Sequence, residues 1–384
     1  MSNKFTTIEA TYRITTPMFC SGADKTKAEL RLPSFKGALR FWWRSLMNGK
    51  VRNVAELRDR EAALFGSSDQ RVGQSKVRMR LAGVRLDRAT RDAKWSKEKG
   101  IQYLGYGVVN YKGELSRLMI PSGVFTVQLR LEPNLSDEQQ QEVQNALILL
   151  GTVGGLGSKS RKGFGSLTLT GLKKDEQVIN LPSSPGDRIK MAVGTPAINL
   201  PEWTAWSSLS RILCVTDNQT DTAAVKLLDS LGKEQVYFRS WGKYEKVLGQ
   251  SSEKNFKEDH NLSKGTRTSI KHPKRIVFGL PHNYGQGRNN AVEPAGRDLT
   301  RRASPLFLHV HQTNERSKPI GVVAFLPALF LPEHEEITAF GNQVSLNRND
   351  DFWDPIHGYI DRLLGKRGAT QKKTTIQAEE VSFD

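Results

Sequence analysis

The chain has 384 residues, with 57 Lys and Arg against 40 Asp and Glu, which gives a formal net charge of +17 at pH 7. That length predicts two domains with a core each, and the positive balance is the electrostatic footprint expected of a nucleic-acid-binding protein. Two widely separated cysteines, Cys20 and Cys214, argue against a disulfide framework and a cysteine zinc site. Residues 1–10 carry no secretory pattern and no stretch approaches a membrane span, so we expect a cytoplasmic protein.

The first strand and the first helix are predicted by two different periodicities. Apolar and polar side chains alternate over residues 5–15, which predicts a half-buried strand that ends at Pro17. Ser34 can cap a helix, and four apolar residues then recur at helical spacing. They are Phe35, Leu39, Trp42 and Leu46.

The other face of this helix is basic. Lys36, Arg40 and Arg44 are four residues apart and form one stripe, and Trp43 falls on its seam with the apolar face. Residues 31–52 contain six basic residues and no acid. The stripe is either a solvated basic face or a set of phosphate contacts. We assign Trp42 to the core and leave Trp43 between stacking on a base and packing under the sheet.

The remainder of the first domain, residues 1–175, alternates strands and helices. A second helix is predicted over residues 54–64, and strands are predicted over residues 76–81 and 123–131. Ser136 and Gln139 form a capping box before a helix that ends near Leu150, and the strand over residues 166–170 follows. The order strand, helix, strand, strand, helix, strand is typical of an α+β, ferredoxin-like (RRM-like) domain.

A glycine-rich loop separates that helix from the last strand. Two Gly-hydrophobic-Gly triplets, at residues 155–157 and 163–165, bracket five polar positions. Glycine lets the backbone approach a ligand, and the lysines and arginine between the triplets suit phosphate, although a plain structural turn is the alternative. The loop residues expected to bind RNA are Gly155, Gly157, Lys159, Arg161, Lys162, Gly163 and Gly165.

Two other phosphate-binding loops do not fit these residues. A triphosphate-binding loop needs glycine immediately before its lysine and again five positions earlier, where this chain has Ser158 and Val153. The dinucleotide pattern fails because Ser160 stands where its third glycine belongs.

The second domain is predicted over residues 204–366, after a linker or partly ordered crossing at 176–203. Apolar runs predict strands over residues 211–215, 306–311 and 320–330, and a helix is expected over 350–364. Residues 248–302 are polar and basic, which suggests a long mobile insertion. The tail over residues 367–384 is predicted to be disordered.

Smaller motifs have two interpretations each. Arg301 and Arg302 either contact RNA at the start of a strand or form structural ion pairs. His309 and His311 share a face of that strand but lack a third ligand, so ordinary histidines are favoured over a metal pair. Asp24 is interpreted as a turn carboxylate, not a catalytic acid.

Three blocks together resemble the RAMP superfamily of CRISPR proteins. They are residues 28–44, the glycine loop at 155–165 and the Arg-Arg-Ala-Ser-Pro-Leu run at 301–306. Within the superfamily the chain is similar to the family of first subunits of the Cmr (type III-B) effector complex. The resemblance implies tandem ferredoxin-like domains and a non-catalytic subunit that holds the 3′ part of guide RNA, next to other RAMP subunits, and aids binding of target RNA. It implies no cofactor.

A metal-independent endoribonuclease of the same superfamily is the alternative function. Such an enzyme commonly uses a histidine base near the 2′-hydroxyl. All seven histidines lie at residue 260 or beyond, so the first domain has none. A lysine or tyrosine base remains open.

Overall fold

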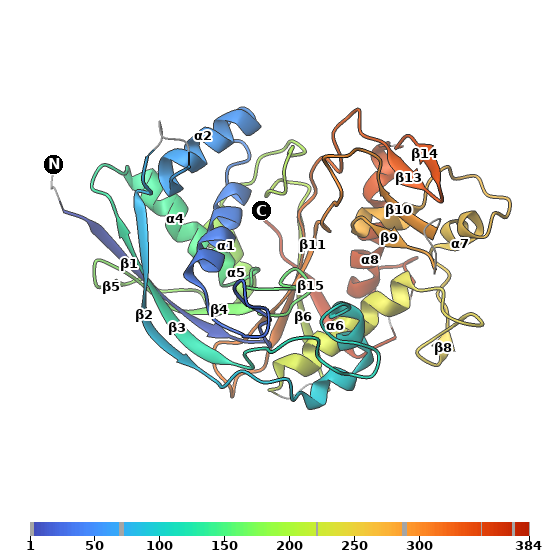
Figure 1. Cartoon of the computed structure of the whole chain (residues 1–384), viewed down its shortest axis with the longest axis horizontal. Coiled ribbons are helices and arrows are strands. Elements are labelled where there is room, and N and C mark those ends of the chain that lie inside the picture. The colour runs from blue at the N-terminus through green and yellow to red at the C-terminus, as the bar shows by residue number, and fades with distance from the viewer. Residues whose placement is uncertain are drawn as a thin grey trace.

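The structure, a computed structural model, describes residues 4–68, 73–219, 222–285, 290–346, 348–370 and 373–383. These residues form two α+β units that lie side by side (Figure 1). The first unit is built on one antiparallel sheet with the strand order β2-β3-β1-β4-β5. Its strands are β1 Thr6–Ile14, β2 Val77–Leu86, β3 Gly123–Leu131, β4 Leu167–Lys174 and β5 Gln177–Val178.

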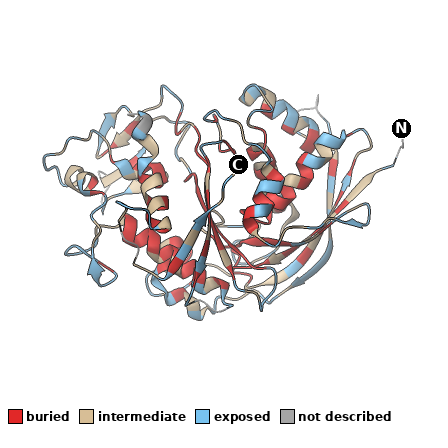
Figure 2. Cartoon of the chain, turned by 180° about the vertical axis from the view of Figure 1, so that it is seen from behind, coloured by how far each residue is buried: buried red, intermediate tan, exposed pale blue. Residues whose placement is uncertain are grey.

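Helices cover one face of this sheet, because alternate side chains of the strands are apolar and need a partner layer. Figure 1 shows α1, α2 and α4 on the same side of β1 and β3, and Figure 2 shows buried residues where the helices face the sheet. The buried Tyr12 of β1 donates its hydroxyl to the backbone oxygen of Leu147 in α4, at 3.0 Å. The helices are α1 Leu32–Ser45, α2 Val54–Phe65, α4 Asp137–Leu150 and α5 Pro185–Val193.

The first residues of the helices show which sequence signals were sufficient to locate them. The Ser136 capping box is confirmed, with both reciprocal hydrogen bonds formed to Gln139. Helix α1 begins at Leu32, two residues before the predicted cap Ser34, and its N-cap Arg31 makes no side-chain capping bond. Pro33 in the first turn explains the earlier start, since its fixed φ suits that position.

The second unit repeats the strand order of the first. Its antiparallel sheet has the strand order β11-β12-β6-β15. In each unit, the strand that comes first in the sequence lies between that unit's third and fourth strands. Helices α6 Ala224–Arg239 and α8 Asp354–Leu364 belong to this sheet, and the pattern analysis missed α6. The strands are β6 Arg211–Asp217, β11 Leu306–His311, β12 Ile320–Phe325 and β15 Ile376–Glu380.

Strand β15 corrects the prediction of a disordered tail. It pairs with β6 over five residues, and Val381 then donates its N–H to the oxygen of Ile212 at 2.8 Å. Ile376 is fully buried, and Phe383 packs against the core of the first unit. Hydrogen-bonded backbone and these two apolar side chains are enough to fix a segment that is otherwise polar.

The predicted linker is also packed. Ile189 and Ala192 of α5 are buried, and Arg188 donates to the backbone oxygens of Leu169 and Pro182, each at 2.6 Å. Residues 176–203 are therefore a structured crossing between the units.

The expected mobile insertion, residues 248–302, contributes to the core of the second unit, so that prediction is wrong for its described part. Phe256, Ile276 and Phe278 are each at most 8% exposed and hold the segment against α6 and α8. Residues 286–289 lie outside the described part. The elements around and within the segment are β7 Lys246–Val247, β8 Gln250–Ser251, α7 Lys257–Ser263, the 3-10 helix η2 Lys274–Phe278, β9 His282–Asn283 and β10 Ala291–Pro294. Strands β9 and β10 form a small sheet with β13 Ile337–Ala339 and β14 Asn342–Val344.

The two units meet along β11 and the chain that enters β4. Backbone N–H groups of Leu308, Val310 and Gln312 donate to the Arg161 backbone oxygen, the Ser166 hydroxyl and the Thr168 hydroxyl, at 3.0, 3.1 and 3.0 Å. His309 is fully buried beside Gly154, with its Nδ1 2.8 Å from the Gly154 oxygen. The glycine loop thus lies at the junction of the units. Among the described helices, none is both long and apolar enough to cross a membrane.

Candidate nucleic-acid interface

The glycines of the loop allow the chain to pack against itself. Gly157 and Gly165 have φ of 85° and 61°, which favour glycine. A Cβ on Gly155 would lie 2.6 Å from the Gly165 oxygen, and one on Gly163 would collide with the side chain of Leu228. The close approach that we predicted toward a ligand is therefore made toward the protein's own backbone and α6.

Lys159 and Arg301 lie at the solvent side of the loop. Lys159 is half-buried and has a positive φ of 65°, and Arg301 is exposed. Burial lowers the pKa of Lys159, and the nearby charges of Arg301 and Arg117 lower it further. Arg117 donates from Nη1 to the Ser158 hydroxyl at 3.2 Å. Cations from three separate segments therefore lie close together here.

Arg161 and Arg302 lie deeper. The Arg161 guanidinium donates to the Ser304 oxygen at 2.8 Å and lies 4.7 Å from the ring centre of Phe307 and 5.1 Å from that of Phe41. Burial, followed by the charge of Arg302, lowers the pKa of Arg161 to about 10. Arg302 donates to the Leu329 oxygen at 3.2 Å, while its buried Nε has no hydrogen-bond partner.

Lys162 is the cation most affected by its surroundings. It is half-buried, its backbone forms a parallel bridge with Leu308, and Arg239 from the last turn of α6 lies nearby. Burial, then the charges of Arg239 and Lys159, lowers the pKa of Lys162 to about 7. The buried Nε of Arg239 also lacks a partner, and its guanidinium lies 4.4 Å from the ring centre of Phe278.

We call these seven residues the central basic cluster. Within the described ranges, none of the seven forms an ion pair with an acidic side chain. Like charges repel one another, so the site favours a polyanion that would neutralise them. The members are Arg117, Lys159, Arg161, Lys162, Arg239, Arg301 and Arg302.

The basic stripe of α1 has a different environment. Arg40 Nε lies 2.7 Å from Glu61 Oε1 in α2, and Arg44 donates to the same oxygen. Lys36 and Arg40 line an open cleft of about 870 Å³, and burial lowers the pKa of Lys36. The acid that pairs with two of the three cations, and offsets part of their charge, lies in the next helix along the chain.

Trp43 is a core residue. It is 1% exposed, and its ring nitrogen donates to Glu142 Oε2 at 3.2 Å. The stacking interpretation is therefore wrong for Trp43, because the ring faces α4 and not solvent. Trp42, at 3% exposed, is in the core as predicted.

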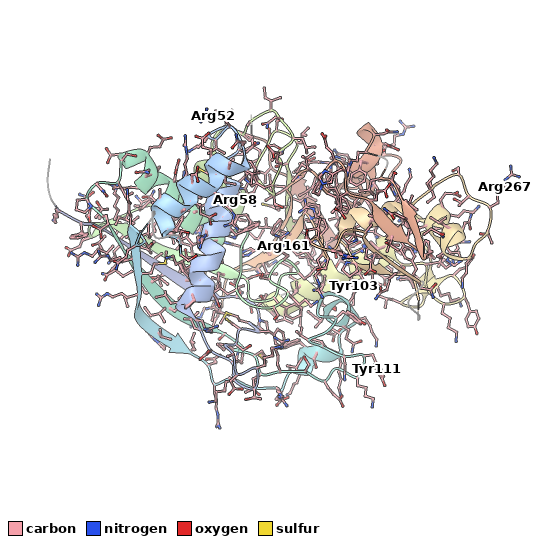
Figure 3. All side chains as sticks on the ribbon, turned by 45° about the horizontal axis from the view of Figure 1, so that its top comes forward. Arg52, Arg58, Tyr103, Tyr111, Arg161 and Arg267 are labelled. Carbon is pink, nitrogen blue, oxygen red and sulfur yellow. The ribbon has the colours of Figure 1, made fainter. Side chains whose placement is uncertain are left out.

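Figure 3 shows how the labelled residues lie across the molecule. Arg161 is near the middle, between Arg58 on the side of α1 and α2 and Tyr103 on the side of α6. The glycine loop and the Arg301–Arg302 pair lie together at this place, and the described part of residues 248–302 supplies neighbours such as Phe278.

Two members of the cluster were missed from the sequence. Arg239 ends a helix that carries no side-chain cap, and Arg117 lies in a loop without a distinctive motif. A periodicity search over residues 224–239 would have identified the helix and its basic last turn.

The minor motifs are structural. Asp24 accepts hydrogen bonds from the N–H and hydroxyl of Thr26, which lower its pKa, so it is the predicted turn carboxylate. His309 and His311 are buried at 0% and 2% exposed, and burial lowers both pKa values, that of His309 to about 4. In the described part of the chain, no group of three or more His, Cys, Asp or Glu residues is placed to hold a metal ion.

Comparison with known proteins shows which family this part of the chain is similar to. Residues 11–168, which include α1 and the glycine loop, match the RAMP superfamily. The resemblance drawn from the three sequence blocks is thereby confirmed.

Known relatives are similar to this chain over a larger share of its length. The CRISPR system Cmr subunit Cmr1-1 of Pyrococcus furiosus is 27% identical over 316 residues, covering 79% of this chain and 82% of the relative. Subunit Cmr1-2 of the same organism is 28% identical over 174 residues, which are 41% of this chain and 92% of the relative. The crystal structure of apo Cmr1 from P. furiosus has a TM-score of 0.51 at 20% identity, covering 91% of this chain and 96% of that one, and shares the fold.

Proposed function

We propose that this chain is a non-catalytic RNA-binding subunit of a type III-B CRISPR (Cmr) effector ribonucleoprotein. It holds the 3′ region of guide RNA and aids the binding of target RNA in antiviral defence, with other RAMP subunits as neighbours. We also propose that both units are ferredoxin-like domains, which their shared strand order supports. The relatives named as Cmr subunits support the assembly.

One observation carries the RNA-binding proposal: seven cations from both units gather around the glycine loop without an acidic partner in the described ranges. Phosphate groups of a single strand would supply the missing negative charge. Contact through phosphates makes recognition tolerant of sequence, which suits a subunit that must hold guides of many sequences.

The residues proposed to contact RNA follow from their exposure. Lys159 and Arg301 face solvent and are proposed phosphate contacts, with Lys162 beneath them. Arg161, Arg302 and the glycines position the loop. The α1 residues Lys36, Arg40 and Arg44 remain proposed contacts of a second, weaker kind, because Glu61 already neutralises part of their charge.

Sequencing of bound RNA tests the guide assignment. The chain is purified from its native host with its assembly, and RNA crosslinked to it by ultraviolet light is sequenced. We expect short species that share an invariant 5′ end and carry crosslinks in their 3′ part. Crosslinks confined to the 5′ end, or no RNA at all, would contradict the proposal.

The endoribonuclease alternative retains one specific observation. Lys162, with a pKa of about 7, has the basicity of a catalytic lysine. His282, which interacts with Lys162, is unsuited as a base because burial lowers its pKa to about 2. Release of 2′,3′-cyclic phosphate ends from repeat RNA by the purified chain, lost in Lys162→Arg, would establish the nuclease. Intact RNA after incubation supports the binding subunit.

A further inference from the structure

A loop beside the central basic cluster presents two bare aromatic rings to solvent. Tyr106 is 78% exposed and Tyr111 is 80% exposed, within the segment of residues 105–117 that follows α3 Lys99–Leu104. We call this segment the tyrosine loop. One exposed ring needs no explanation, but two on one short loop expose a large apolar area that the chain itself does not cover.

The tyrosine loop is held firmly. Val108 and Val109 are each 2% exposed and anchor it in the core. The side-chain oxygen of Asn110 accepts the N–H groups of Lys112 and Glu114, each at 2.9 Å, and the Gln102 side chain donates to the backbone oxygen of Tyr111 at 3.2 Å. A ligand that contacts the rings would therefore lose little free energy to ordering of the loop backbone.

The tyrosine loop is continuous with the central basic cluster. Arg117 at its end donates to Ser158 of the glycine loop, and Gly105 at its start lies against the ring of Phe164. Tyr103, in the helix that leads into it, lies with its ring centre 5.9 Å from the guanidinium of Arg239. Figure 3 shows Arg161, Tyr103 and Tyr111 succeeding one another across the view.

Charge decides which class of ligand the rings suit. Residues 94–117 contain five basic and two acidic residues, and the ammonium of Lys112 lies 5.9 Å from the ring centre of Tyr111. A polyanion with flat apolar faces satisfies both the cations and the rings, because every nucleobase offers a π-face. Single-stranded RNA has this chemistry.

We propose that the tyrosine loop is a stacking platform on which bases of single-stranded RNA pack against Tyr106 and Tyr111 as the strand leaves the central basic cluster. This inference rests on the proposed RNA-binding function and adds a base-contacting subsite to its phosphate contacts. Stacking of this kind tolerates any base sequence and contributes little to the dependence of binding on salt.

Binding of two labelled strands by the full chain tests the platform. Fluorescence anisotropy is measured with oligouridine and with an abasic ribose-phosphate strand of equal length. The variant Tyr106→Ala/Tyr111→Ala is expected to bind oligouridine about tenfold or more weakly, with an unchanged salt slope, and to bind the abasic strand like the native chain. Tyr106→Phe/Tyr111→Phe, which keeps both rings, should retain native affinity. Tyr244→Ala, at an 82% exposed tyrosine elsewhere, is the matched control and should have no effect.

Three results would overturn the platform. The first is that Tyr106→Ala/Tyr111→Ala binds oligouridine with native affinity. The second is that this variant loses affinity equally for oligouridine and for the abasic strand. The third is native RNA affinity together with loss of co-assembly with other subunits, which would assign the rings to a protein contact. If the native chain binds RNA and loses it in Lys159→Ala/Arg301→Ala while the tyrosine variants stay unchanged, the stacking inference fails alone. A native chain with no RNA affinity removes the proposed function and the platform together.

Discussion

The α1 stripe of Lys36, Arg40 and Arg44 and the central basic cluster contain similar basic side chains, but their electrostatic surroundings differ. Arg40 and Arg44 share the carboxylate of Glu61, whose side chain is 8% exposed. The cations around the glycine loop have no such partner within the described ranges, and the pKa of Lys162 falls to about 7 as a result of burial and of its neighbours. Regular spacing of basic residues on a helix thus does not show whether those residues are paired with an acid.

Removal of two cations from the cluster has the largest expected effect. Lys159→Ala/Arg301→Ala should weaken binding of single-stranded RNA about a hundredfold at constant salt, because each charge-assisted hydrogen bond contributes about 1.5 to 3 kcal/mol. Lys190→Ala/Lys226→Ala removes the same charge from exposed positions outside the cluster and serves as the control in a filter-binding assay. Equal losses in both variants would show that only net charge matters.

Loss of the carboxylate that pairs with two cations of the stripe affects stability. Glu61→Gln should lower the free energy of unfolding by about 1 to 3 kcal/mol, since two guanidinium groups lose their charged partner. Urea denaturation followed by circular dichroism measures the change. Glu315→Gln, which breaks the pair between Arg13 and the 77% exposed Glu315, should cost less than about 1 kcal/mol. A Glu61 variant as stable as the native chain would mean that the stripe is not held by this pair.

Several elements could be predicted from sequence because their signals are local. Strand alternation located β1 and β3, and a serine–glutamine box located α4. The pairing of the α1 stripe with Glu61 could not be predicted. Glu61 lies 17 residues from Arg44 and 21 residues from Arg40, and it approaches them only when α2 packs on α1. Strand β15 was missed because its polar residues carry no core pattern until β6 provides the hydrogen bonds.

The glycine loop illustrates a partial success. Its basic residues and Arg301–Arg302 were separate candidates from the sequence, and only the structure brings them together. Its glycines were assigned to a ligand, but in the structure they approach Phe19, Leu228 and the loop itself. Helix α6 was missed because Ala223 gives it no capping signal. Arg239, in its last turn, was therefore not recognised as a member of the cluster.

Lys162 is expected to make the proposed RNA binding sensitive to pH. Phosphate favours the charged amine, so binding raises its pKa above about 7 and takes up a proton. Affinity should therefore fall as pH rises above 7, by at most about tenfold per unit. The groups that face this amine are Arg239, Lys159 and His282, and His282, with a pKa of about 2, stays neutral over this range. Lys162→Arg should abolish the dependence, and an equal pH profile in that variant would assign the titration to another group.

The stripe is expected to have the smallest effect on binding. Arg40→Gln/Arg44→Gln/Glu61→Gln removes both cations together with their acid, so no buried charge is left unpaired. RNA affinity should fall less than about threefold, in keeping with partly exposed charges that Glu61 already offsets in part. A loss as large as that of the cluster variant would place the stripe on the main RNA path.

The salt dependence of RNA binding tests the central claim most directly. The logarithm of the binding constant is measured against the logarithm of salt concentration for the native chain, Lys159→Ala/Arg301→Ala and Lys190→Ala/Lys226→Ala. The cluster variant should flatten the slope by about 1.4, which is about 0.7 for each of two lost phosphate contacts, and the control should match the native slope. A native slope in the cluster variant would contradict the assignment of the glycine-loop cations to RNA phosphates.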